Sequence, residues 1–124
     1  MKTSYYQNKL LDGARHLIVQ TSVGVPRFGA FPEWEMDSIK PPKEILGMAE
    51  ADYVKAYLAQ LERIGVEAIR NELQELEAEA AKTGREVVLC CFESLKKSGQ
   101  FCHRRIFADW WQRQTGEVIP ELKP

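Results

Sequence analysis

The sequence lacks any apolar run long enough to cross a bilayer. Such a crossing needs about 20 consecutive apolar residues, and polar or charged side chains interrupt every apolar stretch of this chain. Its first residues, Met1 to Lys9, also lack the apolar segment of a secretory signal peptide. We therefore expect a cytoplasmic protein with no membrane partner.

The sequence also has little net charge and little cysteine. The formal net charge is −1 at pH 7, so the chain has no global positive field of the kind that drives nonspecific nucleic-acid binding. An anion site must therefore be local. Three cysteines in a chain without a secretion signal argue against a disulfide framework and predict reduced thiols.

The strand signals predict a small sheet in one domain. A chain of 124 residues with 44% hydrophobic residues can bury one core, so we expect one domain over residues 1–124. The β-branched run 17–23 ends at Gly24 and predicts a short strand. The run 86–92 is apolar on both faces and predicts a central parallel strand, covered by helices above and below.

Three stretches with apolar residues every three or four positions predict helices. Their expected limits are Glu50 or Asp52 to Gly65, Val66 to Gly84, and Cys102 to Gly116. Residues 117–122 predict a short edge strand, because Pro120 is tolerated only at an edge. The fold class is therefore α/β: a single compact domain with a small, mainly parallel sheet flanked by helices.

Residues 24–42 are dense in glycine and proline and predict a long loop. Its aromatic residues Phe28, Phe31 and Trp34 give it apolar area, which we expect to pack against the body of the domain. A different reading makes this loop a docking surface for a structural partner. The oligomeric state is not determined by the sequence.

The reactive side chains gather around the end of the strand at 86–92. Strand alternation places Cys91 and Glu93 on one side and Cys90 on the other, where we expect Cys90 to be a core residue. Ligands of open α/β sheets bind outside the carboxyl ends of the strands, where the next helix directs its N–H groups. The segment from Cys91 to Arg104 is therefore the candidate site.

Cys102 is the candidate nucleophile of this site. It lies at a helix start, where the macrodipole and the neighbouring His103 and Arg104 favour a thiolate. Glu93 or His103 would then transfer protons. The competing interpretation is structural: Cys102 and His103 only begin a helix, and Arg104 forms an ion pair with Glu93.

The spacing of the cysteine, histidine and arginine residues tests three more specific kinds of site. A Cys-x5-Arg phosphatase loop is excluded, because Lys97 stands six positions after Cys91 and Ala108 six positions after Cys102. A zinc site could use Cys91, Cys102 and His103, but there is no Cys-x-x-Cys pair, and we expect adjacent Cys and His on a helix not to face one ion. We therefore predict no metal. A redox pair of Cys91 and Cys102 is conceivable, although nothing in the sequence requires it.

The order Leu89-Cys90-Cys91-Phe92-Glu93, then Phe101-Cys102-His103-Arg104, resembles the signature of the domain of unknown function 488 family. That signature looks like Leu-Leu-Cys-aromatic-Glu, a lysine-containing loop, and Cys-His-Arg. Further segments agree in the same order: 3–6, 24–28, 32–36 and 53–61.

The resemblance implies a compact α/β domain with a small, mainly parallel sheet, and it implies no established activity. The implied motif positions are Cys91, Glu93, Cys102, His103 and Arg104, with Arg27 a looser match. The chain departs from similar members at Val23, where they often have a basic residue, so an anion contact from that position is not expected.

Our leading hypothesis is a pocket that binds an anionic ligand, of phosphate or nucleotide type, with Cys91 in its wall. Arg104, Arg27 and Lys97 would hold the anion. In the enzymatic version, Cys102, Glu93 and His103 would carry out thiol-dependent catalysis. The sequence does not name a cofactor, a substrate or a reaction.

The alternative hypothesis is a nucleic-acid or nucleotide binding module without turnover. Basic side chains would form its patch: Lys96, Lys97, Arg104, Arg105 and Arg113. Trp110 or Trp111 would then stack on a base.

Overall fold

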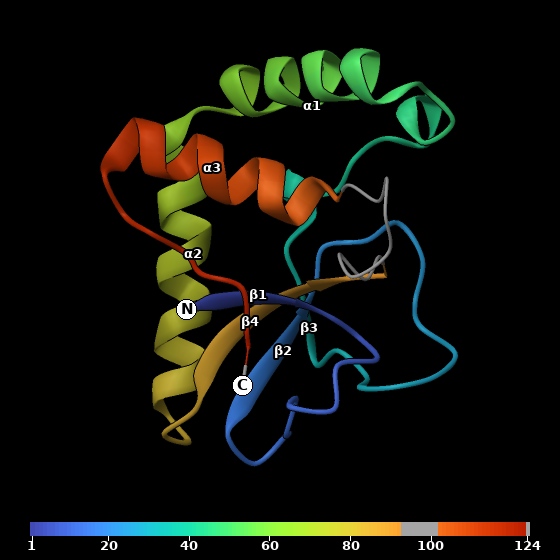
Figure 1. Cartoon of the computed structure of the whole chain (residues 1–124). Helices are drawn as coiled ribbons and strands as arrows, with labels where there is room; N and C mark the ends of the chain where they lie inside the picture. The colour runs from blue at the N-terminus through green and yellow to red at the C-terminus, as the bar shows by residue number, and fades with distance from the viewer. Residues whose placement is uncertain (93–101, 124) are drawn as a thin grey trace.

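The protein forms one sheet of parallel strands in a computed structural model that describes residues 1–92 and 102–123 (Figure 1). The strands are β1 (Lys2–Tyr5), β2 (His16–Gln20), β3 (Trp34–Glu35) and β4 (Glu86–Cys91). Their order in the sheet is β1-β4-β2-β3, and every pair is parallel. The predicted α/β class, the parallel sheet and the inner position of the strand at 86–92 are therefore confirmed.

The predicted helices are also present. They are α1 (Glu50–Ile64), α2 (Val66–Ala81) and α3 (His103–Thr115), preceded by two 3-10 turns, η1 (Asp37–Ile39) and η2 (Lys43–Ile45). Gly116 ends α3 in the left-handed region, at φ +82°, and its N–H donates to the carbonyl of Gln112 at 2.8 Å. None of the described helices combines the length and apolarity that a membrane span requires.

All three helices pack on one face of the sheet. Their buried side chains join Leu17 and Leu89 in one core cluster, including Tyr57 of α1, Ile69 of α2 and Phe107 of α3. A second cluster covers the opposite face and contains Tyr6, Ile18, Val88 and Cys90, with Leu11 and Ala30 packed against it. The expectation of helices above and below β4 is therefore wrong, because loop residues cover the second face. The prediction that Cys90 is a core residue is confirmed.

The loop from β2 to β3 is held by its backbone rather than by its aromatic side chains. The N–H of Ala30 donates to the carbonyl of Tyr6 at 2.8 Å, and Gly29 beside it has φ +86°. The aromatic side chains are largely exposed: Phe28 by 70%, Phe31 by 62% and Trp34 by 45%. The expectation that they pack against the body is therefore wrong.

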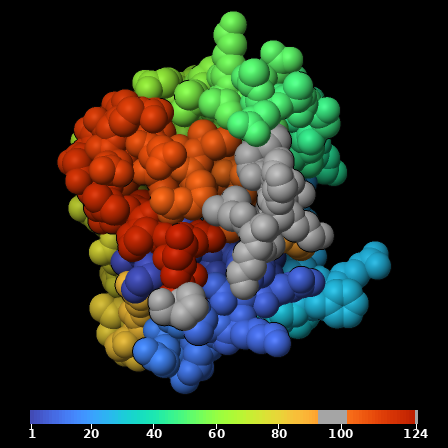
Figure 2. Space-filling view, viewed as in Figure 1, coloured from blue at the N-terminus to red at the C-terminus, as the bar shows by residue number. Residues whose placement is uncertain are grey.

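The chain's last described segment runs along the outer edge of β1, and Figure 2 shows the red tail beside the blue N-terminal segment. The N–H of Thr3 donates to the carbonyl of Pro120 at 2.9 Å, and the N–H of Leu122 donates to the carbonyl of Thr3 at 2.8 Å. The predicted edge strand is thus reduced to a single bridge, Thr3 to Glu121. This bridge brings Glu121 close to the start of α3.

Candidate functional site

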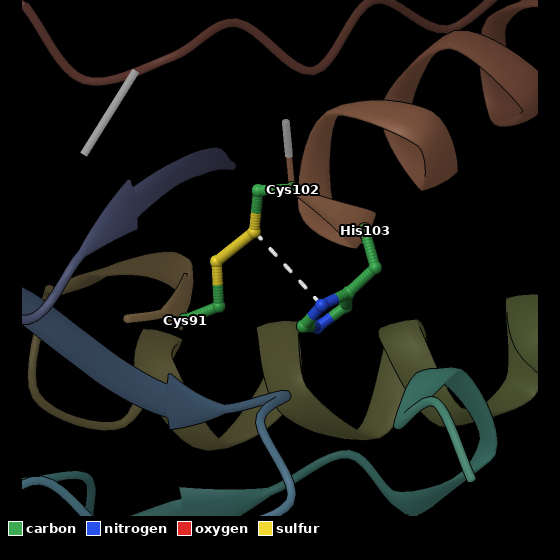
Figure 3. A group of neighbouring side chains, drawn as sticks. All are labelled: Cys91, Cys102 and His103. Carbon is green, nitrogen blue, oxygen red and sulfur yellow. Dashed lines mark hydrogen bonds between the residues drawn. A yellow bond between two sulfur atoms is a disulfide. The ribbon is translucent and has the colours of Figure 1, made fainter. Parts of the chain in front are cut away.

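The candidate site lies where β4 ends and α3 begins. Cys91 is the last residue of β4, Cys102 is the N-cap of α3, and His103 is the first residue of that helix. All three side chains are buried, with exposed fractions of 0%, 3% and 4%. Figure 3 shows them converging from the strand and the helix start. The structure therefore brings together three of the residues that the sequence singled out.

Cys91 and Cys102 form a disulfide, with 7.5 Å between their Cα atoms. The expectation of reduced thiols is therefore wrong for this pair. Cys90 is a free thiol on the other face of the sheet. Burial raises the pKa of Cys90 to about 12, although the charge of Arg104 opposes the shift. The two neighbouring cysteines thus differ completely in role, as strand alternation predicts.

His103 is oriented by the end of β2. Its Nε2 lies 2.7 Å from the carbonyl oxygen of Thr21 and 3.1 Å from the hydroxyl of the same residue. Since a carbonyl only accepts, Nε2 carries the proton and Nδ1 keeps its lone pair. Nδ1 lies 3.9 Å from the sulfur of Cys102 (Figure 3).

Burial lowers the pKa of His103 to about 4, against the raising effect of its hydrogen bond to Thr21, and the charge of Arg104 lowers it further. The imidazole is therefore neutral near pH 7. The edge of the His103 ring also meets the ring of Tyr57, with the centroids 5.7 Å apart. Contacts to β2 and α1 thus fix the ring in place.

Arg104 connects the disulfide to the chain's last segment. Its Nη1 donates to the sulfur of Cys91 at 2.8 Å. Its Nε and Nη2 donate to the two carboxylate oxygens of Glu121 at 3.0 and 2.6 Å. The Arg104 side chain is fully buried and that of Glu121 is 12% exposed, so removing either partner would leave a poorly solvated charge, at a cost of about 3–5 kcal/mol.

Three further residues were predicted for the site: Glu93, Lys97 and Arg27. Glu93 and Lys97 lie outside the described residues, and so does the anticipated pair of Arg104 with Glu93. Arg27 is exposed on the loop after β2, and no described contact joins it to the cysteines. Glu121, in contrast, was missed by sequence reasoning, because nothing near it in the sequence indicates a partner 17 residues away.

A groove of about 870 Å³ lies beside two residues that contact Arg104. Tyr5 and Glu121 line it, and both also contact Arg104: the guanidinium carbon lies 6.0 Å from the Tyr5 ring centre. Three cationic residues line the same groove: Lys9, Arg105 and Lys123. The groove and the disulfide thus share Arg104 as their common neighbour.

The tryptophans proposed for base stacking are core residues. Trp110 and Trp111 are each 2% exposed, and their indole N–H groups donate to Glu62 and Glu117, both at 2.7 Å. That part of the nucleic-acid hypothesis is therefore wrong. The burial of Arg104 likewise removes it from any surface patch.

Comparison of the chain with protein-family models, with curated proteins and with solved structures finds no match.

Proposed function

We propose that the protein has a thiol-dependent function that involves a small anionic ligand of phosphate or nucleotide type. The observation that carries this proposal is the 2.8 Å contact from Arg104 Nη1 to the sulfur of Cys91. A guanidinium at this distance stabilises negative charge on sulfur. Cys91 is therefore the better nucleophile of the pair, and Cys102, which the sequence favours, becomes its disulfide partner.

The chemistry of the pair is the conversion between disulfide and dithiol. Two electrons and two protons, supplied by a small thiol reductant, convert the Cys91–Cys102 bond into two thiols, and the reductant becomes a disulfide. We place the protein in the cytoplasm, where such reductants are abundant. Membership in the domain of unknown function 488 family is part of the same proposal, on the strength of the motif order.

The groove beside Arg104 is the proposed ligand site. Lys9, Arg105 and Lys123 line it, while the negative charge of Glu121 is balanced by Arg104. The described residues of the groove therefore carry a positive charge excess that favours an anion. Arg104 does not line the groove, so an anion bound there would act on Cys91 indirectly, through Tyr5 and Glu121, which both contact the Arg104 guanidinium.

The proposal is tested by comparing two alkylating agents on the reduced protein, anionic iodoacetate and neutral iodoacetamide. We expect the ratio of their rates at Cys91 to exceed, several-fold, the same ratio at glutathione, because the groove concentrates anions. Inorganic phosphate or a nucleoside monophosphate should slow the reaction, and added salt should weaken the preference. Mass spectrometry of peptides assigns the labelled cysteine.

Two charge-removing variants test the groove directly. Lys9→Gln and Lys123→Gln should each reduce the preference for iodoacetate, whereas Lys55→Gln, exposed on α1, is the matched control and should not. A rate ratio equal to that of glutathione, without protection by phosphate or nucleotide, would refute the anion site. If Cys91 in the folded, reduced protein resisted both reagents, the thiol-dependent function would be wrong.

A further inference from the structure

Three atoms with strong metal affinity lie together at the end of β4. The sulfurs of Cys91 and Cys102 and the ring nitrogen of His103 are all within 4.8 Å of one another (Figure 3). We propose that the reduced protein binds one Zn²⁺ ion through Cys91 Sγ, Cys102 Sγ and His103 Nδ1. This proposal goes beyond the thiol-dependent function and does not depend on an anionic ligand.

The backbone at Cys102 allows two consecutive residues to face one ion. Cys102 is extended, at φ −144° and ψ 140°, whereas His103 is the first helical residue. The two side chains therefore do not diverge as neighbours inside a helix do, and both turn toward Cys91 (Figure 3). The sequence-based objection to a metal site assumed helical geometry for both residues, and on that point it is wrong.

The imidazole of His103 is already arranged as a ligand. Metal-binding histidines characteristically donate their second ring N–H to a carbonyl or carboxylate, which fixes the ring and its tautomer. Here Nε2 lies 2.7 Å from the carbonyl oxygen of Thr21, which leaves the lone pair of Nδ1 on the side of the sulfurs. His103 is buried, with 4% of its surface exposed, so water does not compete freely for this lone pair.

Among the described residues, the charges of the cluster balance when a divalent ion is bound. Zn²⁺ replaces one proton on each thiol, and the two released protons pass to solvent, while the neutral imidazole gives a lone pair only. Two thiolates and Zn²⁺ sum to zero, and so do Arg104 and Glu121 beside them. Arg104 also donates to Cys91 at 2.8 Å, a contact that would stabilise a sulfur ligand.

The donor set and its dimensions favour zinc. Two sulfurs and one imidazole suit Zn²⁺ and exclude Mg²⁺ or Ca²⁺, which prefer oxygen. Bonds of about 2.3 Å to sulfur and about 2.0 Å to nitrogen give a tetrahedral sulfur–nitrogen edge of about 3.5 Å, and the distance from Cys102 Sγ to His103 Nδ1 is 3.9 Å. The 7.5 Å between the Cα atoms of Cys91 and Cys102 exceeds the usual span of about 4.4–6.8 Å for a disulfide and leaves room for two separated sulfurs.

The test uses the full chain, reduced with a phosphine, freed of metal and kept without oxygen. Co²⁺, a spectroscopic substitute for Zn²⁺, should bind at one equivalent, with water as the fourth ligand beside the three side chains. It should give the visible bands of a four-coordinate ion and a sulfur-to-cobalt charge-transfer band of two thiolates. Zn²⁺ should displace it. X-ray absorption of the zinc form should show sulfur at about 2.3 Å and nitrogen at about 2.0–2.1 Å.

Single substitutions assign the ligands. Cys91→Ser and Cys102→Ser should each halve the charge-transfer band and weaken zinc binding by about tenfold or more, and His103→Gln should weaken binding while keeping the band. Cys90→Ala, next to Cys91 but on the other face of the sheet, is the matched control and should behave as the wild type.

Three results would overturn the proposal. They are no stoichiometric Co²⁺ or Zn²⁺ binding by the reduced wild type, an undiminished band in Cys91→Ser, and equal zinc affinity of the disulfide form. Far-UV circular dichroism identifies a variant that has failed to fold, and the X-ray absorption of the wild type then decides the ligand set without any variant.

Discussion

Gly29 lies in the loop between β2 and β3, where its Cα approaches the backbone of Tyr6. The substitution Gly29→Ala adds a methyl group to a residue with φ +86°, and that group would collide with the carbonyl carbon and oxygen of Tyr6. The same carbonyl accepts the hydrogen bond from Ala30 at 2.8 Å. The variant therefore combines backbone strain with a steric clash in one place.

The two effects can be estimated separately. Holding an alanine in the left-handed region costs about 1–2 kcal/mol. Displacing the Tyr6 carbonyl weakens its hydrogen bond, which costs about 0.5–1.5 kcal/mol more. Alanine also lowers the conformational entropy of the unfolded chain, which offsets about 0.4–1 kcal/mol of the loss. We expect Gly29→Ala to lower the free energy of unfolding by about 2 kcal/mol.

Urea denaturation of three variants separates the causes. Gly116→Ala has a similar φ of +82° with no atom within 4 Å of the added methyl, so it isolates the strain and should cost about 1 kcal/mol. Gly47→Ala meets open space at ordinary φ and should be neutral or slightly stabilising. If Gly29→Ala lowered the free energy of unfolding no more than Gly116→Ala does, the collision with Tyr6 would have no measurable cost and the reasoning would be refuted.

Two further predictions concern a buried hydroxyl and an ion pair. The hydroxyl of Tyr57 donates to the carbonyl of Ile39 at 2.6 Å in the core, so Tyr57→Phe should cost about 1–3 kcal/mol in urea denaturation; a loss below about 0.5 kcal/mol would contradict this. The hydrogen bond from Lys2 holds the pKa of Glu86 below its ordinary value of 4.5, despite partial burial. The ionised Glu86 carboxylate therefore stabilises the fold above pH 4.5, and this stabilisation is lost as the pH falls through the lower pKa of the folded state. The difference in free energy of unfolding between the wild type and Glu86→Gln should therefore become smaller in acid. A gap that widened in acid would show that the sign is wrong.

The elements with a strong local signal were predictable from the sequence. The spacing of apolar residues fixed α1 and α2, and the apolar run of β4 indicated an inner strand. β1 was missed because Thr3 and Ser4 are polar, yet both are fully buried. The hydroxyl of Ser4 accepts a hydrogen bond from the nearby Asn8, but the hydroxyl of Thr3 donates to Glu121, 118 residues away. A local sequence pattern carries no information about a partner that distant.

The candidate site divides in the same way. The rule that strand ends and helix starts meet in α/β sheets predicted that Cys91, Cys102, His103 and Arg104 would come together. It could not predict Thr21, whose carbonyl orients His103 from 82 residues away. It also could not foresee the extended backbone of Cys102, because residue type alone does not show whether Cys102 is the N-cap or the first residue of the helix.

The edge between β1 and the last segment has a consequence for the order of folding. Thr3 donates its hydroxyl to Glu121 across 118 residues, and the same carboxylate holds Arg104. We expect contacts between residues this distant in sequence to form late, because the entropy cost of closing the long loop between them must be met before the contact stabilises the fold. Until this contact has formed, Arg104 lacks the carboxylate that holds it beside Cys91. Maturation of the cysteine site thus depends on the last long-range closure of the chain.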